Sequence, residues 1–130
     1  MVVMGAADMG RAVRFWAAAL GYEVREGGAG AEWSSLTPAG GLGTGIGLQQ
    51  SDTAADAYPR VHLDLYAADA AEQAAEVERL VRLGAEKVDW DRYPDDPDFV
   101  VLADPEGNRF CIVNTSHGHA SEAPAREAMR

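Results

Sequence analysis

A histidine and an aspartate stand two residues apart in the stretch RVHLDLY, residues 60–66. Apolar and polar residues alternate along this stretch, and a strand points successive side chains to opposite faces. The pattern therefore places His62 and Asp64 on one face of a strand, together with Tyr66. A histidine oriented by a carboxylate can act as a general base near neutral pH. The spacing predicts a pocket-lining pair capable of acid–base chemistry, and a purely structural histidine is the alternative.

Further residues with suitable chemistry fall on predicted strands or strand ends. Cys111 alternates with Phe110 and Ile112, which should pack under a helix, so its thiol should face the same side as His62. The acidic sequence supplies no basic neighbour to activate this thiol, which favours an inert buried cysteine over a reactive one. Aromatic walls with a few polar groups are typical of small-molecule pockets, although aromatic residues also serve as plain core. On this basis Trp33, Tyr66 and Trp90 are expected beside the pocket.

The composition is that of an ordinary globular chain of one domain. The chain has 130 residues, of which 47% are hydrophobic and 25% charged, and no apolar run approaches the roughly 20 residues that cross a bilayer. A net charge of −10 argues against nucleic-acid binding and mildly favours a cationic ligand, with solubility as the plain alternative. The single cysteine and the lack of a signal-peptide pattern indicate the cytoplasm.

The residues above must be positioned by strands, and the sequence predicts two runs with the same order of elements. Asp8 and Asp69 each precede a helical pattern and can cap a helix, while Gly21 and Gly84 end those patterns. The two caps stand 61 positions apart and the two glycines 63, which indicates an internal repeat. The predicted strands are residues 1–7, 22–25, 31–37 and 44–50 in one run, and 60–67, 85–89, 99–103 and 109–115 in the other.

These patterns predict an α+β fold of two βαβββ repeats. Each repeat alone leaves one sheet face uncovered, and two repeats side by side can form an eight-stranded open cup with the helices outside. One domain is expected over residues 1–115, with repeat one at 1–50, a linker at 51–59 and repeat two at 60–115. The tail, residues 116–130, has no periodic apolar face and is expected to be mobile.

Three stretches resemble a known family. They are ADMGRAVRFWAAALGYEV at 7–24, RVHLDLYAAD at 60–69 and LADPEGNRFCIV at 102–113. With the repeat, they are similar to the vicinal oxygen chelate superfamily, which includes glyoxalase I, bleomycin-resistance proteins and extradiol dioxygenases. The nearest resemblance is to bacterial glyoxalase-like domain proteins, and it covers the chain from residue 1 to about 115.

The resemblance implies a divalent metal in the cup, held by one ligand on the first strand and one on the last strand of each repeat. His62 matches one of these positions. The equivalent first-strand position falls at or before Met1, and Gly47 and Cys111 stand where the family has glutamates. His62 is then the only retained ligand of a degenerate site, so no cofactor is predicted and a divalent metal is the alternative. A slip of register by one residue would bring Gln49 or Gln50 nearer the cup.

The resulting hypothesis is a binding protein that holds a small apolar or cationic molecule, as antibiotic-sequestering relatives do. The alternatives are a metal-dependent lyase, isomerase or dioxygenase, and a metal-free acid–base enzyme using His62 and Asp64. A third is a structural subunit whose cup is filled by its own side chains. The resemblance also implies a homodimer, with the cup formed within one chain or across two, and neither nucleic acid nor membrane is an expected partner. The predicted ligand-binding residues are Trp33, Gln49, His62, Asp64, Tyr66, Trp90 and Cys111.

Overall fold

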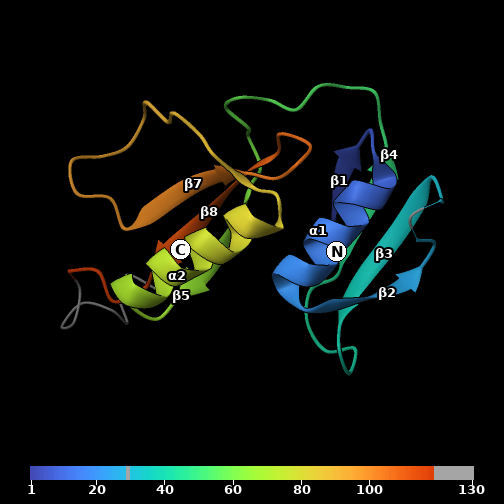
Figure 1. The fold of residues 1–130 in the computed structure, drawn as a ribbon, viewed down its shortest axis with the longest axis horizontal. Helices are drawn as coiled ribbons and strands as arrows, with labels where there is room; N and C mark the ends of the chain where they lie inside the picture. Colours follow the sequence, from blue (N-terminus) through green and yellow to red (C-terminus); the bar gives the residue numbers. More distant parts are fainter. Residues whose placement is uncertain (29, 119–130) are drawn as a thin grey trace.

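The structure, a computed structural model, describes residues 1–28 and 30–118 and contains two βαβββ modules in chain order (Figure 1). The predicted α+β class with two such repeats is confirmed. The first module consists of β1 (Val2–Ala6), α1 (Met9–Leu20), β2 (Tyr22–Glu26), β3 (Trp33–Pro38) and β4 (Ile46–Gln50). The second consists of β5 (Leu63–Ala67), α2 (Ala70–Leu83), β6 (Glu86–Lys87), β7 (Phe99–Ala103) and β8 (Arg109–Asn114).

Both helices begin and end where the sequence predicts. The Asp8 carboxylate accepts a hydrogen bond from the Arg11 N–H at the start of α1, and Asp69 does the same for Glu72 in α2. These bonds satisfy backbone donors that the first turn of a helix leaves without a partner. Gly21 ends α1 with a φ of 67°, a left-handed conformation that glycine adopts without steric cost.

Each module folds its strands into one open four-stranded sheet of mixed direction. The strand order is β1-β4-β3-β2 in the first sheet and β5-β8-β7-β6 in the second. The first strand of each module pairs in parallel with the last, and the register is the same in both. Val3 pairs with Gly47 in the first sheet, and Asp64 pairs with Cys111 in the second. Gly47 and Cys111 are therefore equivalent positions of the repeat.

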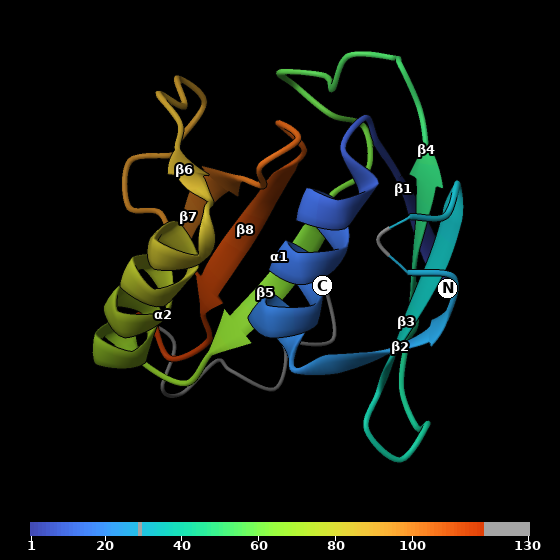
Figure 2. The same cartoon turned by 45° about the vertical axis from the view of Figure 1, so that its right-hand side comes forward.

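One hydrophobic core extends under both helices and through both modules. Each helix covers a single face of the sheet in its own module (Figure 2). Trp16 on α1 is fully buried, and its ring packs edge-on against Phe110 on β8 at 5.1 Å between centroids. Ile112 joins the same core, whereas Cys111 lies in a separate small cluster on the opposite face of the second sheet, with Val101 and Val113. The alternation predicted for β8 is thus confirmed.

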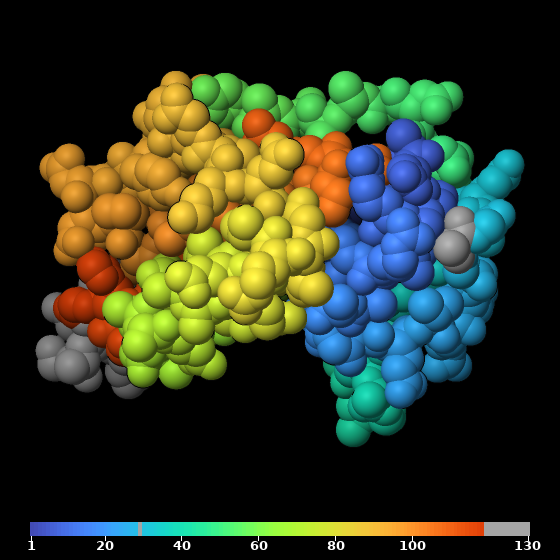
Figure 3. Space-filling view, in the orientation of Figure 1, coloured from blue at the N-terminus to red at the C-terminus, as the bar shows by residue number. Residues whose placement is uncertain are grey.

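The turn between β7 and β8 joins the two modules. The Glu106 carboxylate accepts hydrogen bonds from the backbone N–H groups of Ala7 and Asp8 and from the Arg11 guanidinium. Asn108 donates from its side chain to the Gly5 carbonyl. Figure 3 shows this orange turn in contact with the blue start of α1. The two modules consequently share polar contacts as well as a core.

The strands predicted at 60–67 and 85–89 are both shorter in the structure. The strand expected at 60–67 begins only at Leu63. Its alternation would put Val61 on the helix-covered face with Leu63 and Leu65, but Val61 precedes β5 and is 76% exposed. The strand expected at 85–89 is reduced to Glu86–Lys87. The Trp90 N–H donates to the Val88 carbonyl, a tight turn that takes this segment away from β7.

The other described residues form no helix or strand. Residues 51–62 connect β4 to β5 without helix or strand, and the linker predicted at 51–59 lies within this segment. Of the predicted mobile tail at 116–130, residues 119–130 lie outside the described residues. Neither helix of the described residues is long and apolar enough to cross a membrane.

Candidate functional site

The face of the second sheet that no helix covers holds a cavity of about 450 Å³. Its lining residues all come from the end of the linker and the second module, so the first sheet contributes none of them. The wall combines aromatic and aliphatic side chains with a few charged ones. The lining residues are Pro59, His62, Asp64, Trp90, Arg92, Asp98, Phe99, Val101, Arg109, Cys111 and Val113.

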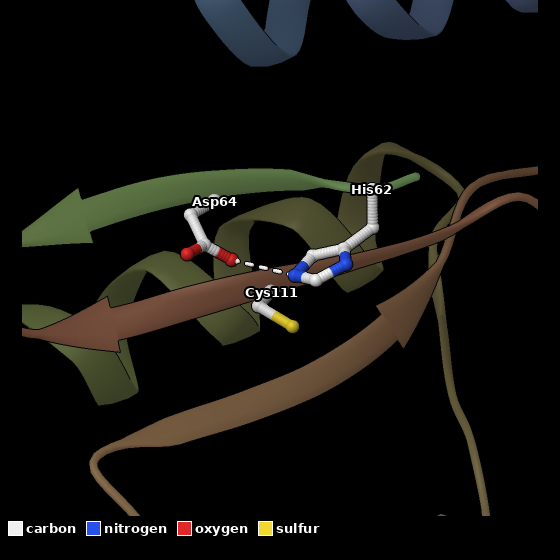
Figure 4. A group of neighbouring side chains, drawn as sticks. All are labelled: His62, Asp64 and Cys111. Atoms are coloured by element: carbon white, nitrogen blue, oxygen red, sulfur yellow. Dashed lines mark ion pairs between the residues drawn. The ribbon is translucent and has the colours of Figure 1, made fainter. Parts of the chain in front are cut away.

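Three side chains that can ligate a metal converge in this cavity. His62 precedes β5, and Asp64 on β5 lies in register with Cys111 on the neighbouring strand β8. The His62 Nε2 atom is 3.1 Å from an Asp64 carboxylate oxygen, and a nitrogen, an oxygen and the Cys111 sulfur all lie within 4.8 Å of one another (Figure 4). The side chains of His62 and Asp64 are 44% and 31% exposed, so a ligand in the cavity can reach them.

The Cys111 thiol is held in its protonated form. It is 8% exposed. Burial, followed by the charge of Asp64, a hydrogen bond to Asp64 and the charge of Asp98, raises the pKa of Cys111 to about 12. Because the thiolate is the nucleophilic form, the thiol is unreactive at neutral pH in the absence of a metal. This agrees with the inert buried thiol expected from the sequence.

The metal implied by the family resemblance can be tested against these donors. Zinc binds imidazole nitrogen, carboxylate oxygen and thiolate sulfur, and three protein ligands leave a position open for a further ligand. His62, Asp64 and Cys111 fit such a site within one module. Metals that prefer several oxygen ligands fit it poorly, because it offers a single carboxylate.

The equivalent position in the first module cannot supply a ligand. A Cβ atom on Gly47 would lie 2.5 Å from Cη2 of Trp33, far inside normal van der Waals contact. The Trp33 ring therefore covers the place where a glutamate side chain would have to stand, and Met1 approaches the same position with its sulfur. The residues fit a three-donor site in the second module, and they do not fit a four-ligand site shared by both modules.

The structure brings together some of the predicted site residues and separates others. His62, Asp64, Trp90 and Cys111 line the cavity. Trp33 and Gln49 pair with each other across β3 and β4 on the first sheet, and Tyr66 on β5 is 59% exposed outside the cavity wall. Because none of these three residues lines the cavity, their role in ligand binding stays a prediction.

Sequence reasoning missed several residues of the wall. It placed Asp64 and Cys111 at the pocket but did not group them with His62 as metal donors, which the strand register does. It also missed Arg109, whose place on β8 two residues before Cys111 puts it on the cavity side. Arg92 enters the wall from the loop after β6, where its guanidinium lies 3.9 Å from the centre of the Tyr58 ring.

A second cavity of about 440 Å³ lies at the seam between the modules. It is lined by β1, the linker and the starts of β5 and β8, and it shares Pro59, His62 and Arg109 with the first cavity. His62 and Arg109 therefore stand in a wall common to both cavities.

Comparison with known proteins agrees with this architecture. Solved structures with a similar fold include a protein from Agrobacterium tumefaciens, with a TM-score of 0.69 and 14% identity over 87% of this chain and 93% of that chain. A glyoxalase/bleomycin resistance protein/dioxygenase family enzyme from Burkholderia phytofirmans has a TM-score of 0.66 and 18% identity, over 87% and 94%. A variant of the fosfomycin resistance protein FosX from Listeria monocytogenes, in complex with Mn(II) and dihydroxypropylphosphonic acid, has a TM-score of 0.68 and 15% identity, over 97% and 94%.

At these identities the structural likeness shows the fold alone. No curated protein matches the chain in sequence. The sequence model of the glyoxalase-like domain family, however, matches residues 1–113, nearly the whole of the two modules. The chain therefore belongs to the glyoxalase-like domain family.

Proposed function

We propose that this protein binds a small molecule in the cavity of the second module, with His62 and Asp64 as polar contacts. The observation that carries the proposal is the cavity itself, which joins converging donors to an apolar wall that includes Trp90, Phe99 and Val101. Ligand sites are typically concave and mostly apolar, with a small number of placed polar groups. FosX, a protein of similar fold, was solved with a small phosphonic acid and Mn(II), which supports small-molecule binding by the fold.

A second candidate is an enzyme, and the three metal-ligating side chains favour it. A divalent metal held by His62, Asp64 and Cys111 would polarise a substrate oxygen, as a lyase, isomerase or dioxygenase of this superfamily requires. The chain's own contribution would be to orient the substrate against the aromatic wall and to exclude water. Without a metal, the Asp64 carboxylate orients the imidazole through Nε2, which leaves the Nδ1 atom of His62 to take a proton from the ligand.

We also propose that two copies assemble into a homodimer. Met1 and Val3 are 65% and 51% exposed on the uncovered face of the first sheet, and Tyr66 is 59% exposed on that of the second. Exposed apolar residues on uncovered sheet faces mark surfaces that associate. In such a dimer, Trp33 and Gln49 of a second copy would face the cavity that lacks them here. A monomer in light-scattering measurements at micromolar concentration would exclude this assembly.

The binding proposal is tested by screening metabolites for a rise in melting temperature, since a ligand that binds only the native state stabilises it. Each hit is then measured with the Asp64→Asn and His62→Asn variants, which we expect to bind about tenfold more weakly. Asp52→Asn is the matched control, because Asp52 is exposed in the linker and lines neither cavity. Equal affinity for all variants would remove His62 and Asp64 from the site.

The buried, unpaired thiol of Cys111 further supports the cytoplasm, a reducing compartment, as the proposed location.

A further inference from the structure

Arg109 is a half-buried cation without a carboxylate partner among the described residues. Arg79 is the other half-buried arginine of the described residues. Its Nε atom lies 2.8 Å from a carboxylate oxygen of Glu76, and its guanidinium donates to two backbone carbonyls of α1. Arg109 donates one hydrogen bond from Nη1 to the Gly107 carbonyl, and its buried Nε atom has no hydrogen-bond partner in the part of the chain that the structure describes. A guanidinium has five N–H donors, so most of the hydrogen-bonding capacity of Arg109 is unused.

This charge stands at the junction of the two cavities. Arg109 lines both of them, as does His62. Arg92 adds a second guanidinium to the wall of the first cavity, where it stacks on the Tyr58 ring and pairs with no carboxylate of the described residues. The same wall also holds two carboxylates, that of Asp64, which lies 3.1 Å from the His62 Nε2 atom, and that of Asp98, which is 7% exposed. The cavity thus presents two guanidinium groups, neither of which forms an ion pair with a described residue.

An unneutralised cation in this wall has a physical cost. Taking a charge partly out of water is unfavourable unless an opposite charge or hydrogen bonds replace the lost hydration. The chain has 21 acidic and 11 basic Lys and Arg residues, so carboxylates are abundant, and yet no carboxylate of residues 1–28 and 30–118 pairs with Arg109. A ligand that supplies the missing anion would gain charge-assisted hydrogen bonds without displacing an existing pair.

We infer that the ligand of this cavity carries an anionic oxygen group, a carboxylate or a phosphate, bound by Arg109 with Arg92 near it. The inference rests on the proposed binding function and names the ligand class: a small organic acid whose apolar part lies against Trp90 and Phe99. It reverses the preference for a cationic ligand that the net charge of −10 suggests, because contacts within a cavity outweigh a screened long-range field.

Four probes that share one ring and differ in charge test the inference: benzoate, phenyl phosphate, benzyl alcohol and benzylamine. Metal is first removed from the protein with a chelating resin, so that no metal holds the anion and no soluble chelator competes with it. Each probe is then titrated into the full chain, and backbone NMR shifts are followed at Trp90 and Val101. We expect at least one anion to bind about five- to tenfold more tightly than the alcohol, with the amine weakest. Comparison of benzoate with phenyl phosphate then identifies the kind of anion.

Variants separate the role of Arg109 from general electrostatics. Arg109→Gln should weaken anion binding about tenfold and remove the preference over the alcohol, and Arg109→Lys should retain part of it. Arg25→Gln, the same charge change at an exposed position of β2, should alter affinity less than about twofold. Should Arg109→Gln fail to fold, the lysine variant carries the comparison.

Two outcomes overturn the inference while leaving the binding function in place. One is an alcohol or amine that binds the native protein as tightly as the anions. The other is an anion preference of native size in Arg109→Gln, or in Arg109→Lys where the glutamine variant does not fold. If none of the four probes shifts the cavity signals, the proposed binding site itself is wrong.

Discussion

The indole N–H of Trp16 donates to the carboxylate of Asp104 at 2.9 Å, across 88 residues of sequence and between the two modules. Both residues are buried, and the same carboxylate accepts the backbone N–H groups of Glu106 and Asn108. One side chain of α1 thereby helps to hold the turn that leads into β8, the strand that carries Arg109 and Cys111. The position of the cavity wall depends on this contact between the modules.

We therefore predict that Trp16→Phe destabilises the protein by about 1–3 kcal/mol, because it leaves a buried carboxylate with one donor fewer and removes part of the packed ring. Urea unfolding followed by circular dichroism measures the change. Trp33→Phe is the matched control, since Trp33 makes no hydrogen bond from its ring among the described residues and lies outside the seam. Equal midpoints for the two variants would show that the contact with Asp104 contributes nothing.

Glu106 should make the stability depend on pH. Burial alone raises the pKa of Glu106, but the hydrogen bonds from Arg11, Ala7 and Asp8 outweigh it and lower the pKa overall. Because the folded pKa lies below the unfolded value of about 4.3, this stabilisation is present above that pH and is lost as the pH falls through the folded pKa.

Glu106→Gln should accordingly reduce the free energy of unfolding by about 2 kcal/mol at pH 7, since it weakens hydrogen bonds made to a charge. The difference from the native protein should shrink below pH 4. Glu23→Gln, at an exposed residue of β2 without a side-chain contact among the described residues, serves as the control. If the difference in the free energy of unfolding did not change with pH, the lowered pKa of Glu106 would be wrong.

The elements were predictable from the sequence because their signals are local. The capping aspartates and the terminal glycines of both helices, and the alternation of Phe110 with Cys111, depend on neighbours a few residues away. The contacts of Glu106 with Ala7 and of Trp33 with Gly47 depend on how strands and modules pair, which no short pattern specifies. The alternation of residues could place His62 and Asp64 on one face of a strand. That Cys111 lies beside them depends on the pairing of β5 with β8, which the sequence does not specify.

Cys111 should react very slowly in the folded protein. With its pKa raised to about 12, the thiolate fraction at pH 8 is small, and iodoacetamide should modify the native thiol at least about a hundredfold more slowly than the urea-unfolded one. The rate in the native state should climb as the pH rises toward 11. Because the folded pKa exceeds the unfolded value, the stability that this thiol contributes is intact below about pH 8.5 and declines above it. Equal rates at pH 8 in the two states would refute the shift.

Zinc binding is expected to need all three donors of the cavity. Titration with Zn²⁺ alone, followed by mass spectrometry of the native protein and calorimetry, should show one ion per chain. Asp64→Asn, His62→Asn and Cys111→Ser should each weaken it about 10- to 100-fold, a range also measured for changes around metal sites. Binding must release the thiol proton, so affinity should fall as the pH is lowered. A Cys111→Ser variant that holds zinc as tightly as the native protein would exclude the sulfur as a ligand.

Gly47 and Trp33 should be coupled in stability. An alanine at position 47 would place its Cβ atom 2.5 Å from the Trp33 ring, so the ring must move, and overpacking of this kind costs about 1–3 kcal/mol. The Trp33→Leu change removes the obstructing atoms, and adding Gly47→Ala to it should then cost little. A double-mutant cycle in urea measures this coupling, with Gly45→Ala as the control because the Trp33 ring does not approach that glycine. Strict additivity of the two changes would mean that the indole does not close the first module to a ligand side chain at position 47.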